Sequence, residues 1–109
     1  TGSFMDSRGV KLSRNGDGLE WEFGVGLASR YGMEFRFLNR SGRDIPVKVK
    51  LSGVDGTVYW SGELVFSGDR PRWQSVRTDT RSMINAGKYR VILRLEEEEE
   101  ICFNWLRIQ

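Results

Sequence analysis

Few residues in this chain have side chains suited to catalysis. Five consecutive glutamates at positions 96–100 precede the single cysteine, Cys102, and the sequence contains no histidine. The lack of histidine removes the commonest general base, the commonest metal ligand and every Ser-His or Cys-His pair. Cys102 has no base to activate it, so we expect a buried structural thiol. The five carboxylates repel one another, so we expect them to lie in water at the tip of a hairpin.

Arginines in two turn regions are better suited to binding. Arg14 and Asn15 lie at residues 14–18, where Asn-Gly and Asp-Gly pairs predict a turn that tolerates positive φ. Arg70 and Arg72 flank a proline in a second loop. Guanidinium groups pair with carboxylates in a bidentate manner, so these residues can contact an acidic sugar or the carboxylates of a neighbouring domain. The alternative is that they are scattered surface arginines.

The four tryptophans fall into two groups. Trp21, Trp73 and Trp105 occupy alternating positions of predicted strands, which favours packing in the core. Trp60 follows Tyr59, and neighbouring strand residues point to opposite faces. Trp60 is therefore either a core residue or an exposed binding aromatic on a sheet face.

Alternating apolar and polar residues must supply the scaffold for these side chains, and they predict β-strands throughout. The segments are residues 19–25, 31–37, 45–51, 57–66, 73–78, 88–95 and 101–108. Short strands separated by Gly-, Asn- and Asp-rich turns indicate an all-β fold, an antiparallel β-sandwich or jelly roll. We expect the last two segments to form a hairpin, with the final strand paired inside a sheet. The expected core comprises Trp21, Phe23, Phe35, Val49, Tyr89, Val91, Leu93 and Phe103.

Size and composition limit the possible functions. The 109 residues, 39% of them hydrophobic, predict one globular domain spanning residues 1–109. Seventeen Lys and Arg against 15 Asp and Glu give a net charge of +2, which argues against a dedicated nucleic-acid binder. No apolar run approaches the roughly 20 residues that cross a membrane. One cysteine allows no internal disulfide, as in a reducing compartment or in an exported bacterial domain.

Three motifs occur in an order that resembles a known family. They are Gly16-Asp17-Gly18-Leu19-Glu20-Trp21-Glu22-Phe23 followed by residues 31–37, then residues 70–76, and last residues 86–91 with 103–108. Together they resemble family 6 and family 35 carbohydrate-binding modules and their galactose-binding-like relatives, from about residue 8 to the end. The resemblance implies a non-catalytic jelly-roll accessory domain of a glycoside hydrolase, such as a β-galactosidase-like enzyme, that is periplasmic or extracellular in a bacterium.

The resemblance also implies where ligands would bind. In such modules a sugar lies between two loop aromatics and bonds to an asparagine near the C-terminus, and the corresponding positions here include Arg70 and Cys102. The ligand-binding candidates are therefore Arg14, Asn15, Arg70 and Arg72 at one end of the sandwich, with Trp60 on a sheet face as the alternative. No cofactor is expected, because the positions of a structural calcium motif hold Asp6 and Asn104, of which only Asp6 is an acid.

Several functions remain open at this level. The domain either binds a carbohydrate, which can be an acidic sugar, or packs on the catalytic domain of its parent enzyme. The lack of a second stacking aromatic favours packing. A protein-recognition or adhesion sandwich with no sugar ligand is the alternative class, and a small enzyme is the third. A catalytic carboxylate pair would need a pocket, and nothing in the sequence indicates one.

Overall fold

The computed structural model describes residues 3–78 and 81–108, with side chains from Lys11 onward. This part of the chain contains ten β-strands: β1 (Ser3–Leu12), β2 (Gly18–Val25), β3 (Ser29–Tyr31), β4 (Met33–Leu38), β5 (Ile45–Gly53), β6 (Val58–Phe66), β7 (Gln74–Arg77), β8 (Ser82–Ile84), β9 (Gly87–Leu95) and β10 (Ile101–Ile108). Within these residues there is no helix long and apolar enough to span a membrane.

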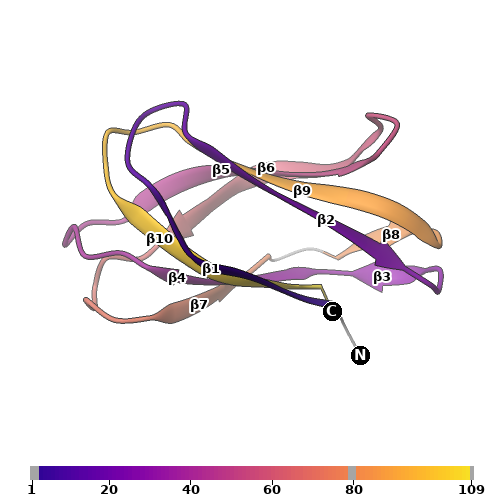
Figure 1. Cartoon of the computed structure of the whole chain (residues 1–109), viewed down its shortest axis with the longest axis horizontal. Helices are drawn as coiled ribbons and strands as arrows, with labels where there is room; N and C mark the ends of the chain where they lie inside the picture. Colours follow the sequence, from indigo (N-terminus) through magenta and orange to yellow (C-terminus); the bar gives the residue numbers. More distant parts are fainter. Residues whose placement is uncertain (1–2, 79–80, 109) are drawn as a thin grey trace.

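The strands form two facing sheets, seen edge-on in Figure 1. Sheet A has the order β1-β10-β4-β7, and sheet B has the order β2-β9-β5-β6. The short strands β3 and β8 form a separate pair. Every pairing among the described strands is antiparallel, which confirms the predicted all-β sandwich. The final strand β10 lies between β1 and β4, as predicted.

The core lies between the two sheets and follows from the alternation of each strand. In β5, Val47, Val49 and Leu51 are buried between the sheets, while Lys48 and Lys50 are exposed on the outer side. Phe66 of sheet B contacts three phenylalanine rings of sheet A. All eight residues expected in the core are buried, so that prediction is confirmed.

The predicted C-terminal hairpin is wrong. β9 belongs to sheet B and β10 to sheet A, so the glutamates at positions 96–100 connect the two sheets and do not form the tip of a hairpin. A five-residue connection can serve either purpose, and the alternation in the flanking strands is the same in both cases. The long-range partners decide: β9 pairs with β2 and β5, while β10 pairs with β1 and β4.

Two bulges shift the alternation at tryptophans. In β10 the register shifts between Phe103 and Trp105, so Asn104 is the extra residue and Trp105 pairs with Arg36 on the outer face. In β6 the register shifts at Tyr59, because Leu51 pairs with Trp60 and Ser52 pairs with Val58. Alternation alone would not place either tryptophan, since a single inserted residue reverses the faces of everything beyond it.

Candidate functional site

Four loops gather at one end of the sandwich, at the left in Figure 1. They are the connections β1–β2, β4–β5, β6–β7 and β9–β10, and we call them together the loop end. Hydrogen bonds join them in series. Gly16 N donates to Leu95 O at 2.7 Å, and Gly68 N donates to Asp44 Oδ1 at 3.2 Å. The predicted residues Arg14, Asn15, Arg70 and Arg72 all lie at this end.

The β1–β2 turn is built as its sequence predicts. Gly16 has φ of 96°, a left-handed conformation that disfavours residues with a Cβ. The carboxylate of Asp17 accepts hydrogen bonds from the backbone N–H groups of Ser13 and Arg14, both at 3.0 Å. These two bonds favour the charged carboxylate and hold the pKa of Asp17 below its usual value. The turn therefore presents Arg14 and Asn15 to solvent in a fixed position.

The lowered pKa of Asp17 predicts a loss of stability in acid. A carboxyl group with a lower pKa in the folded state contributes stability above its unfolded pKa of about 4, and this contribution disappears as the pH falls through the folded value. We expect Asp17→Asn to melt at a lower temperature than the parent at pH 7 but to lose less stability between about pH 4 and pH 2. Thermal melts across this range test it, with Glu98→Gln as a control that removes an exposed carboxylate. Parallel pH profiles for Asp17→Asn and the parent would contradict the assignment.

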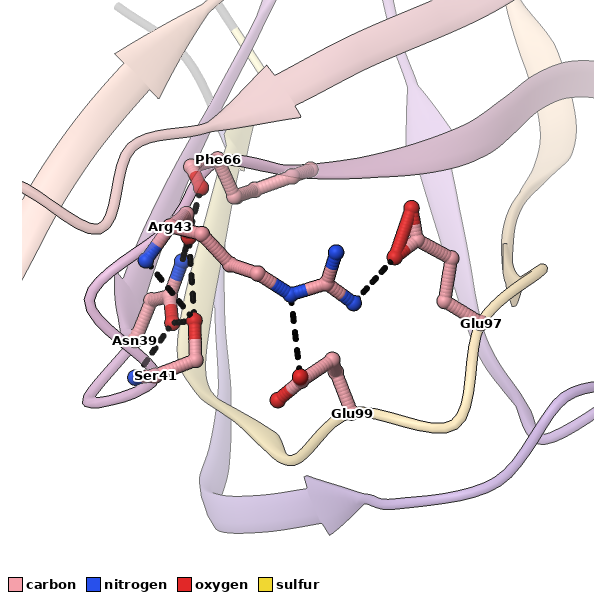
Figure 2. A network of polar contacts seen from close by, with 6 residues as sticks. All are labelled: Asn39, Ser41, Arg43, Phe66, Glu97 and Glu99. Carbon is pink, nitrogen blue, oxygen red and sulfur yellow. Dashed lines mark hydrogen bonds and ion pairs between the residues drawn. The ribbon is translucent and has the colours of Figure 1, made fainter.

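A polar network fixes the β4–β5 loop against the glutamate run (Figure 2). The buried amide of Asn39 donates to the carbonyls of Arg43 and Phe66, at 2.8 and 2.9 Å. Arg43 extends from the same loop, and its guanidinium donates to Glu97 Oε2 at 2.7 Å and to Glu99 Oε1 at 2.9 Å. The two carboxylates raise the pKa of Arg43 above its usual value. The positive charge of Arg43 is therefore balanced by these two carboxylates within the protein.

Cations on other elements bind the remaining ends of the glutamate run. Lys48 Nζ lies 3.8 Å from Glu96 Oε1, and Lys11 Nζ lies 3.5 Å from Glu100 Oε1. With the Arg43 pairs, cations from β1, the β4–β5 loop and β5 contact the connection between the sheets. The run lies at the surface, as expected for adjacent like charges, and four of its five carboxylates are paired with cations.

The predicted binding residues lie on two different loops of the loop end. Arg14 and Asn15 lie on the β1–β2 turn, while Arg70 and Arg72 lie on the β6–β7 loop, with the other two loops between them (Figure 1). Arg70 Nε is 3.6 Å from its neighbour Asp69, and both side chains are exposed. The role of the four predicted residues in binding stays a prediction.

Two of the tryptophans expected in the core lie outside it. Trp73 and Trp105 are only partly buried and do not belong to the core cluster. Cζ of Arg36 lies 5.9 Å from the ring centroid of Trp73, and Cζ of Arg107 lies 5.8 Å from that of Trp105. The bulge at residue 104 explains Trp105, since it moves the ring to the outer face of sheet A. Trp21 is buried, as predicted.

Beside these rings, Glu34 binds two arginines on the outer face of sheet A. Its carboxylate, 9% exposed, accepts a hydrogen bond from Arg77 at 3.1 Å, and Arg107 Nη1 lies 3.6 Å away. Glu34 of β4 therefore pairs with an arginine on each of the two neighbouring strands, β7 and β10. Sequence reasoning missed this cluster, because its three members appear there only as single alternating charges.

Trp60 packs inward instead of facing solvent. It lies opposite buried Leu51 and packs against the core, where its ring covers the inner side of Gly62. A Cβ on Gly62 would lie 2.9 Å from this ring. Tyr59 also turns toward the core side, with its ring 5.4 Å from that of buried Tyr89, although it is 41% exposed. Because of the bulge, Tyr59 and Trp60 both turn toward the core side, and the expectation that one would point inward and the other outward does not hold.

A groove crosses the outer face of sheet B and was missed by sequence reasoning. Its volume is about 620 Å³, and it runs over β9, β5 and β6. Its lining residues are Lys48, Val49, Lys50, Ser61, Gly62, Glu63, Ile92 and Arg94. They form two rows across the strands, since Lys48 pairs with Arg94 and Glu63, while Lys50 pairs with Ile92 and Ser61. The groove is open, basic and without an aromatic ring.

The calcium candidates Asp6 and Asn104 stay a prediction. The side chain of Asp6 lies outside the described residues, and Asn104 is the extra residue of the β10 bulge. Within the described part of the chain, no group of three acidic, cysteine or histidine side chains is arranged to hold a metal ion. Cys102 is partly buried, and burial, with a smaller effect of Glu100, raises the pKa of its thiol. The raised pKa favours the unreactive protonated form at neutral pH.

Comparison with known proteins finds similar folds among solved structures. No family model matches the sequence, and no curated protein sequence does either. Among solved structures, a family 36 carbohydrate-binding domain of a multidomain xylanase, from the hindgut metagenome of Trinervitermes trinervoides, has a TM-score of 0.71 at 11% identity, with 100% of this chain and 97% of that domain covered. A family 35 carbohydrate-binding module from Clostridium thermocellum has a TM-score of 0.67 at 14% identity, with 96% and 90% covered.

The same fold also occurs within a much longer enzyme chain. An isomalto-dextranase from Arthrobacter globiformis T6 matches with a TM-score of 0.70 at 17% identity, over 96% of this chain. This chain spans only 18% of the length of that enzyme. The similar structures also include family 6 modules. The chain therefore has the antiparallel β-sandwich fold of the family 6, 35 and 36 carbohydrate-binding modules.

Proposed function

We propose that this domain is a non-catalytic carbohydrate-binding module, carried by a secreted or periplasmic glycoside hydrolase. The observation that carries the proposal is the match over the whole chain to domains whose own length is almost fully covered. Two similar structures, a family 36 and a family 6 module, hold xylotriose and cellotriose. The long enzyme chains with this fold support attachment to a catalytic domain. A β-galactosidase-like parent stays a prediction.

The groove of sheet B is the site that we assign to the glycan. It is open along the sheet, so a chain of sugars can lie in it without an end having to enter a pocket. Ser61, Glu63 and the three cations supply donors and acceptors for hydroxyl groups, and Ile92 offers an apolar contact. The loop end is less suited, because Arg43 and two glutamates bridge it.

Titration calorimetry against neutral and acidic oligosaccharides tests this function. We expect binding in the range of about 0.1–1 mM, since no aromatic ring in the groove adds stacking energy. Ser61→Ala, which removes a hydroxyl from the groove, should weaken binding, and Arg72→Ala at the loop end should not. If no sugar binds at about 10 mM, the domain is not a carbohydrate-binding module. If only Arg72→Ala weakens binding, the loop end is the site.

The outer face of sheet A favours a second role, contact with the parent enzyme. Trp73, Trp105, Arg36 and Arg107 stack there, and tryptophan and arginine are the residue types enriched at the centres of protein interfaces. In this account, a Trp73→Ala and Trp105→Ala double variant keeps its glycan affinity but changes the orientation of the module in the complete enzyme. Small-angle scattering of that enzyme would show this change, and an unchanged profile would argue against the contact.

A further inference from the structure

We infer that the groove of sheet B selects anionic glycans, whose carboxylate or sulfate groups bind between Lys48, Lys50 and Arg94. This inference rests on the proposed function and adds the chemical class of the ligand. The shared chemistry is a regularly spaced anionic group on a sugar chain. Neutral glycans would use only the hydroxyl contacts of the same groove.

The first observation is a pair of like charges placed directly opposite each other. Lys48 of β5 is the register partner of Arg94 of β9, and both side chains point to the outer face. Like charges in this arrangement destabilise a sheet. Lys50 lies two residues along β5 on the same face, so three cations share one small area. An anion placed between them would relieve the repulsion.

The second observation is that these cations are poorly neutralised. Among the described residues, the side chains of Lys50 and Arg94 form no hydrogen bond or ion pair. Lys48 has only the 3.8 Å contact with Glu96, and its side chain is largely exposed. Glu63 is the single carboxylate in the groove lining. The groove therefore carries a local excess of two positive charges, as large as the net charge of the whole chain.

The same sheet face contains a region where the charges are balanced. Arg90 lies on β9 four residues before Arg94, but its Nε donates to Glu22 Oε1 at 3.0 Å. Arg90 does not line the groove. The charge of Arg90 is thus balanced outside the groove, in contrast to that of Arg94 within it.

The groove matches an acidic sugar in more than charge. The planar guanidinium of Arg94 can donate two parallel hydrogen bonds to a carboxylate or sulfate, and the ammonium groups of Lys48 and Lys50 add single charge-assisted bonds. Ser61 and Glu63 lie across the groove for hydroxyl groups. Single-stranded nucleic acid is also anionic, but its proteins stack bases on aromatic rings, which this groove lacks.

The test compares four probes on the folded domain. They are a hexamer of galacturonic acid, a hexamer of a sulfated galactan that has no carboxylate, cellohexaose and a short oligothymidylate. We expect the two acidic sugars to bind at least about tenfold more tightly than cellohexaose. Their affinity should fall when the ionic strength rises from about 0.01 M to about 0.15 M, because the screening length shortens from about 30 Å to about 8 Å. The carboxylated and sulfated probes separate the two sources of anion.

Matched variants locate the site. Arg94→Gln and Lys50→Gln should each weaken acidic-sugar binding about tenfold and leave cellohexaose binding almost unchanged. Arg90→Gln removes the same charge from the same strand outside the groove, and it should have little effect. Lys50 and Arg94 are exposed, and Arg90 is half-buried at the surface, so circular dichroism is expected to show intact folding.

The other outcomes of these binding experiments reject different parts of the proposal. Equal binding of neutral and acidic sugars would retain the carbohydrate-binding function and overturn the anionic selectivity. Equal effects of Arg90→Gln and Arg94→Gln would overturn the groove as the site. Oligothymidylate binding as tight as that of the acidic sugars would replace selectivity for glycans by general attraction of polyanions. Failure to bind any sugar would instead reject the proposed function itself.

Discussion

Phe66→Ala is expected to lower the free energy of unfolding by about 3–5 kcal/mol, the usual loss for a large buried ring. Phe66 is 0% exposed, and its ring lies 4.9 Å from that of Phe37 and 5.2 Å from that of Phe103. These partners belong to the opposite sheet, so the truncation opens a cavity between the sheets. In a domain of this size the melting temperature should fall by at least about 12 °C.

Two further variants make this result interpretable. Phe66→Leu keeps most of the volume and should lose less than about 2 kcal/mol, which covers the case in which the alanine variant does not fold. Val65→Ala alters the neighbouring residue of β6, which is 52% exposed, and should lose less than about 1 kcal/mol. Urea unfolding measures all three. If Phe66→Ala were as stable as Val65→Ala, the description of the core would be wrong.

Gly68→Ala is expected to disrupt the loop end and to lower the free energy of unfolding by about 1–3 kcal/mol. A Cβ at this position would lie 2.3 Å from the carbonyl oxygen and 2.6 Å from the amide nitrogen of Arg43. Both atoms belong to the backbone, so they cannot rotate away as a side chain could. The β4–β5 and β6–β7 loops would have to separate, which weakens the hydrogen bond from Gly68 to Asp44.

Gly26→Ala is the matched control for this prediction. Gly26 has no heavy atom within 4 Å of an added Cβ and does not have a positive φ. Alanine there should be neutral or stabilise the domain by less than about 1 kcal/mol, because it reduces the freedom of the unfolded chain. Denaturant unfolding compares the two, and amide NMR shifts report on the Arg43 region. Equal stability for the two variants would contradict the close packing of these loops.

The fold class and much of the core could be predicted because each strand carries its own signal. In β2 and β5, apolar residues alternate with charged ones, and the buried face is visible in the sequence. The Asn-Gly turn before β2 also appears where its residue types require it. These features depend on neighbours in the sequence, so they need no knowledge of the partner strands.

The errors arose where distant partners decide the outcome. Whether residues 96–100 form a hairpin or connect two sheets depends on which strands pair with β9 and β10. The faces of Trp60 and Trp105 depend on bulges, which a partner strand reveals and the alternation does not. The short strands β3 and β8 were missed, because three residues are too few to show a period.

The groove could not be predicted for the same reason. Arg94 lies more than forty residues after Lys48 and Lys50, and in the sequence the three residues indicate only the solvated faces of two strands. Only the pairing of β5 with β9 makes Lys48 and Arg94 neighbours. Knowledge of the strand order β9-β5-β6 would have been enough to find the basic cluster.

Amide NMR titration with an acidic oligosaccharide tests most directly whether the groove of sheet B binds the glycan. We expect the largest amide shift changes at residues 48–50, 61–63 and 92–94, with little change at residues 14–15 and 70–72. Shifts that centre on the loop end, with the groove unaffected, would contradict binding in the groove.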